Sequence, residues 1–491
     1  MRDIIFTFFN YFVFFYTSML AIFFVTFAFL SFISLKRRKD YYVESYMRKT
    51  IKESPYTPGI SVIAPAFNEE KTIIDNVNSM LALEYPLFEV VIVNDGSTDS
   101  TLKKMIEHYE LIEVPYAYIE RIKTKPFRRL FKSTSPKYSR LIVVDKENGG
   151  TKADASNAGI NVSSYPYFIC TDVDCILEKY ALYRCISPII SSDKQVIAVS
   201  GTMLMANGCV VKDGQIVDVR TPRTPIPLFQ NLEYMRSYLI GKMGWSAING
   251  MPNVSGGFGL FDRSVAIAAG GYDGTSFAED MDLITRMVGY MCDFSRPYKI
   301  VQIPDTCCWT EGPPNLAMLY RQRTRWARGL FQTLNIHRKM IFKKTYKQMG
   351  LLTLPYMFVF EFLAPIIELT GLIVFIYLAF TGAVNWNTAW MIYLTIYTFC
   401  QFLSIVVITY DYYVGMLYKR GYEYLWIIIA SILEPIFYHP IITFCSLRGY
   451  LSYLTNRDFK WKNMERKGFK QKEENTDDAE TAAMKPEPAT I

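Results

Sequence analysis

One uncharged stretch near the N-terminus limits what this chain can fold into. No charged residue occurs between Ile4 and Leu35, and the stretch ends in the basic run Lys36–Lys39. About 20 apolar residues cross a bilayer, whereas the apolar core of a cleavable signal peptide has only about 7–15 residues. We therefore predict a retained transmembrane helix. Its basic flank places the C-terminal end of this helix in the cytoplasm.

Three more apolar stretches follow near the C-terminus, at Leu351–Phe380, Thr388–Tyr410 and Leu425–Leu447. Basic residues precede the first stretch and follow the second and third, and the positive-inside rule places all of them in the cytoplasm. Two full crossings satisfy this rule, whereas a third crossing would put a basic tail outside. The third stretch also contains Glu434, His439 and two prolines. It is therefore predicted to be re-entrant or interfacial.

The composition argues against a purely soluble protein. Hydrophobic residues make up 51% of the chain, and charged residues make up 20%, which is below the share of about 25% that is typical of soluble domains. The net charge of +7 is spread over 491 residues and does not indicate binding to nucleic acid. The nine cysteines form no CxxC pair and the three histidines no HExxH motif. Reduced cytosolic cysteines and no zinc site are expected.

The chain divides into five predicted segments. Residues 1–39 are the N-terminal transmembrane helix with its basic flank, and residues 56–337 are a cytoplasmic domain that carries most of the polar chemistry. Residues 338–350 form a basic juxtamembrane segment, followed by a membrane region of two or three helices at 351–447. Residues 448–491 are basic at first and end in a disordered acidic tail. This layout predicts a multi-pass protein of the plasma membrane.

The cytoplasmic domain has an α/β pattern. Short apolar runs at 60–66, 89–94, 141–145 and 167–171 alternate with helical stretches, which predicts a mostly parallel sheet with helices on both faces. Ligands bind such sheets at the carboxyl ends of the strands. Acidic residues follow several of the runs, namely Asp95, Asp145, Asp172 and Asp174.

Two of these strand ends suggest a chemistry. Asp172 and Asp174 can both reach one hard cation, which could neutralise a diphosphate; two solvated carboxylates in a turn are the alternative. The segment Asn94–Asp99 is typical of a turn with a helix N-cap. Alternatively, the carboxylate of Asp95 accepts hydrogen bonds from a base or a ribose.

Two further motifs lie later in the domain. Adjacent carboxylates at Glu279 and Asp280 repel each other, and a cleft can raise the pKa of one of them, as a general base requires. The alternative is an acidic helix N-terminus. Gln322, Arg325 and Trp326 share one helix face, where Arg suits phosphate and Trp suits a sugar ring. Here the alternative is an interfacial helix, because four arginines crowd on this turn, namely Arg321, Arg323, Arg325 and Arg328.

In this order and at these spacings, the motifs resemble those of the membrane-embedded processive family 2 glycosyltransferases. That group includes the synthases of cellulose, chitin, hyaluronan and poly-N-acetylglucosamine. The matching segments are Ala64–Glu70, Val93–Asp99, Glu147–Gly159, Asp172–Asp174, Phe277–Asp280 and Gln322–Trp326. The resemblance implies the α/β fold class: a cytoplasmic GT-A (Rossmann-like) glycosyltransferase domain, with α-helical transmembrane segments before and after it.

The resemblance also implies a binding site for the donor. Asp95 and Asp154 would bind the uridine and diphosphate of a UDP-sugar, and Lys152 would lie near them. Asp172 and Asp174 would hold Mg²⁺ or Mn²⁺ against the diphosphate, so Asp172 also belongs to the nucleotide-sugar site.

On the acceptor side, the resemblance assigns catalysis to Asp280 and its neighbour Glu279. Asp280 would take the proton from the acceptor hydroxyl. Gln322, Arg325 and Trp326 would form the processivity motif, in which Arg325 steadies the departing UDP and Trp326 stacks on the acceptor sugar.

The function implied is inverting transfer of sugar from a UDP-sugar to a growing β-linked polysaccharide, with translocation across the bilayer. Accessory export or regulatory subunits are compatible with it. A non-processive enzyme that adds one sugar to a lipid or a protein is the first alternative, and a transporter or inactive scaffold the second. The family often has Asp where this chain has Asn94, and Thr where it has Ala278. These departures could alter donor choice, and the sugar and linkage stay open.

Two surfaces carry further expectations. The segment Arg121–Arg140 has eight basic residues and no acidic one. It is predicted to lie near anionic lipid or a partner, with a solvated loop as the alternative. Aromatic residues of the C-terminal membrane region could line a conduit for the product or could simply face lipid. They are Tyr356, Phe358, Phe360, Phe362, Tyr377, Trp386, Trp390 and Tyr393.

Overall fold

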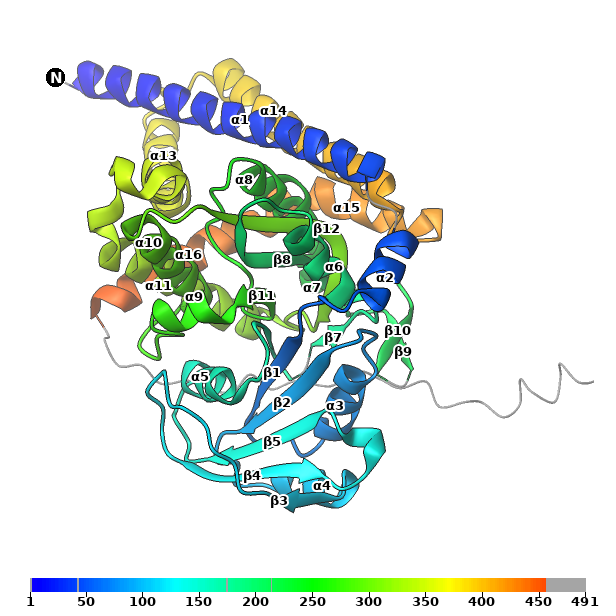
Figure 1. The fold of residues 1–491 in the computed structure, drawn as a ribbon. Helices are drawn as coiled ribbons and strands as arrows, with labels where there is room; N and C mark the ends of the chain where they lie inside the picture. Colours follow the sequence, from blue (N-terminus) through cyan, green and yellow to red (C-terminus); the bar gives the residue numbers. More distant parts are fainter. Residues whose placement is uncertain (1, 42–43, 174, 213, 456–491) are drawn as a thin grey trace, which may run out of the picture.

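The structure is a computed structural model and describes residues 2–41, 44–173, 175–212 and 214–455 (Figure 1). Two predictions therefore fall outside the described residues: the metal-binding role of Asp174, and the disordered tail after Thr455. A helical layer that includes α1 (Arg2–Tyr41) lies at one end of the molecule, and the sheet of the α/β domain extends to the other end.

A ten-stranded sheet forms the centre of the domain, in the order β3-β4-β5-β2-β1-β6-β11-β8-β12-β7. Its strands are β1 Ile60–Ala66, β2 Phe88–Asn94, β3 Leu111–Glu113, β4 Phe127–Ser133, β5 Leu141–Lys146, β6 Tyr167–Thr171, β7 Ile176–Leu177, β8 Gln195–Met205, β11 Phe258–Asp262 and β12 Tyr298–Thr310. A separate pair consists of β9 Val210–Lys212 and β10 Gln215–Asp218.

The expectation of a mostly parallel sheet is wrong, because the sheet is mixed. The four central strands β5, β2, β1 and β6 are parallel, and so are β8 and β12. The other five pairings are antiparallel. A parallel pairing needs a crossover of a dozen or more residues, usually with a helix. The short turn at 134–140 between β4 and β5 cannot provide one, so this edge becomes a meander.

Helices cover both faces of the sheet. They are α3 Ile73–Leu81, α4 Thr101–His108, α5 Lys152–Val162, α6 Ala181–Ile190, α9 Arg263–Ala268 and α10 Glu279–Asp293. Successive residues of β2 alternate between two hydrophobic clusters, since Val91 and Val93 enter one and Val90 and Ile92 the other. The central strands are therefore buried on both sides, which explains their uninterrupted apolar sequences.

A second set of helices joins the domain to the apolar segments. It comprises α2 Glu44–Glu53, α7 Pro225–Arg236, the π-helical turn η2 Ser237–Lys242, α8 Met243–Ala247 and α11 Leu316–Ile336. Short 3₁₀ turns occur at η1 Pro136–Tyr138, η3 Arg338–Met340 and η4 Lys344–Tyr346. The helix α11 carries the Gln322–Trp326 motif and packs against α16 (His439–Thr455).

Among the residues that the structure describes, three helical segments are long and apolar enough to cross a membrane: Tyr11–Arg38 within α1, Met349–Phe380 and Trp386–Val414. The second contains η5 Met349–Thr353, α12 Leu354–Tyr356, η6 Met357–Phe362 and α13 Ala364–Phe380, and the third is α14. The stretch predicted to be re-entrant or interfacial is an interrupted pair, α15 Gly421–Phe437 and α16, bent by 50°.

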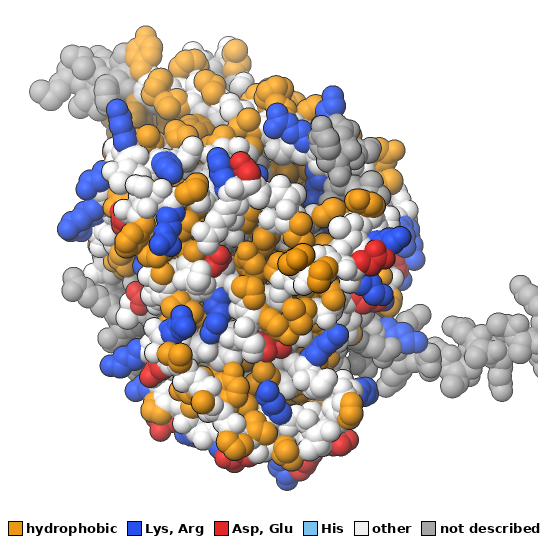
Figure 2. All heavy atoms as spheres, in the orientation of Figure 1, with side chains coloured by type: hydrophobic (Ala, Val, Ile, Leu, Met, Phe, Trp, Pro, Cys, Tyr) orange, Lys and Arg blue, Asp and Glu red, His pale blue; other side chains and the backbone are white. Residues whose placement is uncertain are grey.

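The N-terminal helix is held by residues far away in the sequence. Tyr410 on α14 donates to the carbonyl of Ala28 at 2.6 Å, and α1 and α14 lie side by side (Figure 1). Ser31 donates to the carbonyl of Leu239 in η2. On the face shown in Figure 2, hydrophobic side chains dominate the upper edge over these helices, and charged side chains become frequent below it.

The structure also bears on the two surface expectations. Five of the eight aromatic residues considered for a conduit are exposed, a location that suits contact with lipid; they are Phe358, Tyr377, Trp386, Trp390 and Tyr393. The basic segment includes β4, which lies at the end of the molecule opposite α1 (Figure 1). This position is distant from α1, and proximity of the segment to anionic lipid or to a partner stays a prediction.

Candidate active site

The parallel strands bring the predicted donor residues to one edge of the sheet. Ala66, Asn94 and Asp145 are in register at the ends of β1, β2 and β5. Asp95 directly follows Asn94 in the sequence, and Lys146 directly follows Asp145. The loop after β6 begins at Asp172. The carboxyl ends of neighbouring parallel strands thus converge, as expected for a ligand site in such a sheet.

A buried lysine that the sequence did not single out organises this edge. The Nζ atom of Lys146 lies 2.8 Å from Oδ1 of Asp95 and 2.5 Å from Oδ2 of Asp154, and the Lys146 side chain is fully buried. It also donates to the carbonyl of Glu147 at 2.6 Å. A buried charge is costly unless it is paired. Lys146 and the carboxylates of Asp95 and Asp154 therefore form one ion-paired group.

Asp95 is also held by β1, where its N–H donates to the carbonyl of Ala66 at 2.9 Å, and by the loop after β5. Its Oδ1 also accepts from the backbone N–H of Gly149 at 3.0 Å, and its carbonyl accepts from Asn148 Nδ2 at 2.8 Å. Gly96 has φ +67°, and a Cβ there would lie 2.8 Å from the Asn148 nitrogen. A glycine is needed at this turn for its backbone conformation and for the close approach of the two loops.

The asparagine at position 94, where the family that the motifs resemble often has aspartate, has a physical explanation. Asn94 is buried and donates through Nδ2 to Oδ1 of Asp145 at 2.8 Å, while Arg129 donates to Oδ2 of Asp145 at 3.0 Å. An aspartate at position 94 would place a second carboxylate against buried Asp145. The amide therefore avoids repulsion between like charges in a buried place.

Lys152 was expected near Asp95 and Asp154 but has a different partner. Its Nζ lies 2.6 Å from Oδ1 of Asp172 and donates to the carbonyl of Gly256 at 2.7 Å. Burial opposes the charge of Lys152, yet the nearby carboxylate of Asp172 outweighs it, so the pKa of Lys152 is raised. The cation between Asp95 and Asp154 is Lys146 instead.

A cavity of about 520 Å³ opens beside Asp154, at the N-terminus of α5. Thr151 caps this helix, accepting from the N–H of Asp154 at 3.3 Å. A helix N-terminus with free N–H groups favours anions. The lining residues are Ile122, Lys123, Gly149, Thr151, Asp154, Asn157, Gly270, Tyr272, Asp273, Gly274 and Arg286.

Glu279 and Asp280, the adjacent carboxylates predicted to include the general base, are the first two residues of α10. Asp280 accepts from the N–H of Gly256 at 3.0 Å and from the N–H of Met281 at 2.8 Å. Burial and the neighbouring Asp280 raise the pKa of Glu279, against the lowering effect of Arg325 and Lys152. The backbone of Gly256 thus contacts Lys152 through its carbonyl and Asp280 through its N–H. It joins the candidate base to the sheet edge that carries Asp95, Lys146 and Asp172, which we call the donor edge.

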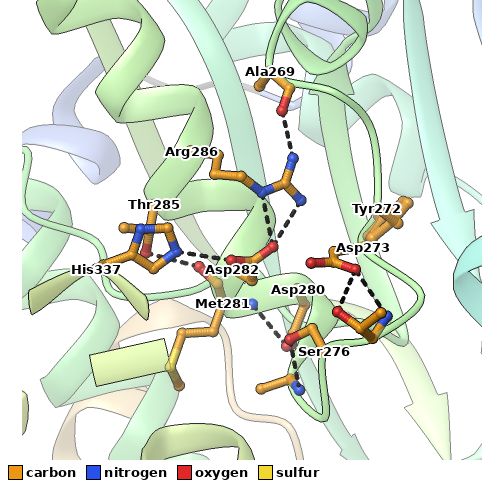
Figure 3. A network of polar contacts seen from close by, with 12 residues as sticks. Ala269, Tyr272, Asp273, Ser276, Asp280, Met281, Asp282, Thr285, Arg286 and His337 are labelled. Carbon is orange, nitrogen blue, oxygen red and sulfur yellow. Dashed lines mark hydrogen bonds and ion pairs between the residues drawn. The ribbon is translucent and has the colours of Figure 1, made fainter. Parts of the chain in front are cut away.

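A polar network fixes the start of α10 (Figure 3). Asp282 accepts from Arg286 Nε at 2.8 Å and contacts His337 Nε2 at 2.8 Å, and Arg286 also donates to the carbonyl of Ala269. His337 follows the last residue of α11. The network therefore ties the helix of Asp280 to the end of the helix that carries Trp326.

This network predicts a pH-dependent stability. Burial alone would raise the pKa of Asp282, but its contacts with His337 and Arg286 outweigh burial, so the pKa is lowered. The stabilisation is complete above the unfolded pKa of about 3.9 and is lost as the pH falls through the folded pKa. We expect Asp282→Asn to lower the thermal midpoint at pH 7, and the difference from the parent to shrink below about pH 4.

Melting curves of the detergent-purified chain across pH test this. Asp293→Asn serves as the control, because Asp293 is exposed at the other end of α10. A difference between parent and Asp282→Asn that stays constant down to pH 3 would contradict the assignment.

The residues of the acceptor motif on α11 differ in exposure and in their partners. Gln322 accepts from Gln230 Nε2 at 3.1 Å, Arg325 is exposed, and Trp326 is half-buried. Arg323, expected to share an interfacial cluster with its neighbours, is instead buried, with its guanidinium carbon 4.5 Å from the centre of the Trp326 ring. A Cβ on Gly329 would lie 2.5 Å from Cβ of Ala278, so α11 packs tightly on the residue before Glu279.

The sequence matches known families along most of this region. Residues 61–203 match the model of glycosyl transferase family 2, and residues 222–410 match that of glycosyl transferase family group 2. A poly-beta-1,6-N-acetyl-D-glucosamine synthase of Staphylococcus aureus (strain COL) is 29% identical over 278 residues, which are 56% of this chain and 55% of the relative. The match thus spans about half the length of the S. aureus protein.

A synthase of the same name from Staphylococcus epidermidis is 24% identical over 393 residues, or 77% of this chain and 83% of the relative. Among solved structures, the mannosyltransferase PcManGT from Pyrobaculum calidifontis, in complex with GDP-Man and Mn²⁺, is 18% identical with a TM-score of 0.47. The match covers 85% of this chain and 98% of that one.

Glucosyl-3-phosphoglycerate synthase from Mycobacterium tuberculosis, solved with Mn²⁺, UDP and glucosyl-3-phosphoglycerate, is 16% identical with a TM-score of 0.33. Here the match covers 60% of this chain and 85% of that one. The two family models lie on either side of the β9–β10 hairpin and between them include the donor edge, the Glu279–Asp280 pair and the Gln322–Trp326 motif. With these two family models, a mixed α/β sheet and apolar helices before and after it, the chain belongs to the family 2 glycosyltransferases.

Proposed function

We propose that the chain is an inverting glycosyltransferase that adds N-acetylglucosamine from UDP-N-acetylglucosamine to a growing β-linked polysaccharide. The names of the staphylococcal relatives support this sugar. The observation that carries the proposal is the backbone of Gly256, which contacts Lys152 through its carbonyl and Asp280 through its N–H. A donor held by the lysine and an acceptor hydroxyl facing the aspartate would meet beside this one residue.

The donor side would be built as follows. Oδ1 of Asp95 is engaged by Lys146 and Gly149, and within the described residues no bond is recorded for Oδ2, which could accept from a uracil or a ribose. Asp154 borders the cavity at the N-terminus of α5. Lys152 supplies a charge against phosphate, and Arg325 lies close enough to influence the pKa of Glu279.

The residues present fit a divalent cation that is shared with the diphosphate. Within the described residues, no group of three His, Cys, Asp or Glu side chains could hold a metal by itself. Mg²⁺, however, typically binds one or two carboxylates plus substrate phosphates and water. Asp172, about one-third exposed, would be such a ligand for Mg²⁺ or Mn²⁺. When bound, the ion would offset negative charge on the leaving diphosphate.

The transfer itself requires one displacement. The acceptor hydroxyl oxygen attacks the anomeric carbon, its proton passes to the carboxylate of Asp280, and the bond from that carbon to the diphosphate oxygen breaks, which releases UDP. Attack opposite the leaving group inverts the anomeric centre, so an α-linked donor gives a β-linkage. Lys152 and Arg325 would stabilise the charge that develops on the diphosphate.

One experiment tests donor, product and export together. The purified chain is reconstituted in sealed vesicles, and UDP-N-acetylglucosamine, UDP-glucose and GDP-mannose are supplied outside with Mg²⁺ or Mn²⁺. We expect UDP release with UDP-N-acetylglucosamine and a polymer that resists an added glycan hydrolase until detergent is present. Products with a single added sugar would support the non-processive alternative. No consumption of any donor would contradict the proposal, and complete digestion without detergent would contradict export alone.

The metal proposal makes a separate prediction. Asp172→Ala should raise the metal concentration needed for half-maximal activity and weaken UDP binding in the presence of metal, because the ion would join protein and diphosphate. Titration calorimetry with UDP, with and without Mn²⁺, measures both effects. Asp193→Ala, at an exposed position after α6, is the matched control. UDP binding to the parent that ignores the metal would exclude this role.

A further inference from the structure

A buried cluster links the acceptor motif to the bend in the membrane region. Arg323 is 6% exposed and forms a two-pronged ion pair with Glu233 of α7, at 2.6 Å and 2.5 Å. Its Nη2 also donates to the hydroxyl of Tyr438 at 2.9 Å, and this hydroxyl donates to Oε2 of Glu233 at 3.0 Å. We call these three residues the Arg323 cluster; each contacts the other two.

The cluster joins three parts of the chain that are distant in sequence. Arg323 lies on α11, Glu233 on α7, and Tyr438 at the break between α15 and α16, where the axis turns by 50°. Tyr438 is 2% exposed and its ring lies 5.4 Å from that of Phe229 on α7. Any change of the bend that displaced Tyr438 would therefore break bonds to Arg323 and Glu233.

The same cluster sets the position of acceptor-motif side chains. The guanidinium of Arg323 lies against the ring of Trp326 at 4.5 Å, a contact typical of cation–π attraction. One turn before Glu233 on α7, Gln230 donates to Gln322. α7 thus holds the motif at two points, through Arg323 and through Gln322, and Arg323 is the buried arginine of this turn.

We propose that Arg323 is a positioning residue that couples the bend between α15 and α16 to Trp326, so that the state of the membrane helices controls how firmly the acceptor saccharide is held. The inference rests on the proposed function, since it needs an acceptor on Trp326. A planar guanidinium suits this role because it can form the two-pronged ion pair and lie flat on the indole at the same time.

The test uses the full chain in vesicles with UDP-N-acetylglucosamine and measures product length, UDP release and UDP affinity. Tyr438→Phe removes one hydroxyl and keeps the ring. Chain length reflects the ratio of transfer to release, so weaker holding should shorten the products by about tenfold or more. The lost hydroxyl makes two hydrogen bonds to charged groups, and one such bond alone corresponds to about this factor. UDP affinity should stay at the parental value, because Asp95 and Asp154 lie elsewhere.

Arg323→Lys keeps the charge but loses the fork, and Glu233→Gln keeps the shape but loses the charge; both should shorten the products as well. Tyr410→Phe is the matched control, because Tyr410 is a buried membrane-helix tyrosine that bonds to Ala28 and not to α11. It should leave the length unchanged. A merely structural role would lower the thermal midpoint and UDP release together without changing length.

Parental product length in both Tyr438→Phe and Glu233→Gln, in a chain that makes polymer, would overturn this inference alone. If Glu233→Gln does not fold, Tyr438→Phe decides. A parent chain that consumes none of the donors would overturn the proposed function and the inference with it.

Discussion

Asp280→Asn should lower the rate of sugar transfer by about 10²–10⁴-fold, the usual cost of removing a positioned general base. The amide keeps the size of the carboxylate, and its single oxygen can still accept from one of the two N–H groups, those of Gly256 and Met281, that bond to the two oxygens of Asp280. Lys146, Asp95 and Asp154 do not contact Asp280, so UDP affinity should change little. Single-turnover release of UDP and calorimetry with UDP measure the two quantities.

Two companion variants sharpen this result. Asp293→Asn, at the exposed end of the same helix, should have parental activity. Glu279→Gln tests the neighbouring carboxylate, whose pKa is raised by burial and by Asp280. If Glu279→Gln lost activity by this factor and Asp280→Asn remained active, Glu279 and not Asp280 would be the general base.

Lys146→Met should be the most destabilising single change at the donor edge. It leaves Asp95 and Asp154 close together without their shared cation, and removal of one partner from a buried ion pair costs about 3–5 kcal/mol. UDP binding should also weaken, because the two carboxylates would repel or become protonated. Thermal unfolding of the purified chain and calorimetry with UDP provide the measurements.

The surface variant Lys103→Met serves as a control, because the side chain of Lys103 is 76% exposed in a pair with Glu107. Combining Lys146→Met with Asp95→Asn removes one of the two unpaired charges and should recover part of the lost stability. An unchanged melting midpoint in Lys146→Met would show that the aspartates do not depend on this lysine.

Local sequence patterns predicted which strands end at the same edge of the sheet. The apolar runs that end near Asn94, Asp145 and Thr171 form β2, β5 and β6. Together with β1 they make up a block of parallel strands in the order β5-β2-β1-β6, as their alternation with helices indicated. The sequence did not single out Lys146, because a lysine at the end of a strand is usually solvated. Its burial depends on Asp95 and Asp154, whose carboxylates both contact its Nζ atom. The signal was present, since Lys146 directly continues a buried strand at the edge where Asp95 lies.

Contacts between distant segments could not be predicted in this way. The four arginines of the α11 turn look alike in sequence, and only the position of Glu233, 90 residues away, makes Arg323 the buried one. The antiparallel entry of β11 beside β6 similarly depends on how residues 172–257 return to the sheet. Local periodicity contains no information on either pairing.

The bonds that hold α1 have a consequence for biosynthesis. Its hydrogen bond from Tyr410 to Ala28 joins residues 382 positions apart. At a synthesis rate of about 5–20 residues per second, α1 leaves the ribosome about 20–75 s before this partner exists. Ser31 lacks its acceptor for about the first half of that interval, because Leu239 of η2 is 208 residues away. Throughout the interval, the face that later contacts α14 is open to lipid or to the insertion machinery. The helix that is made first is therefore among the last to reach its final packing.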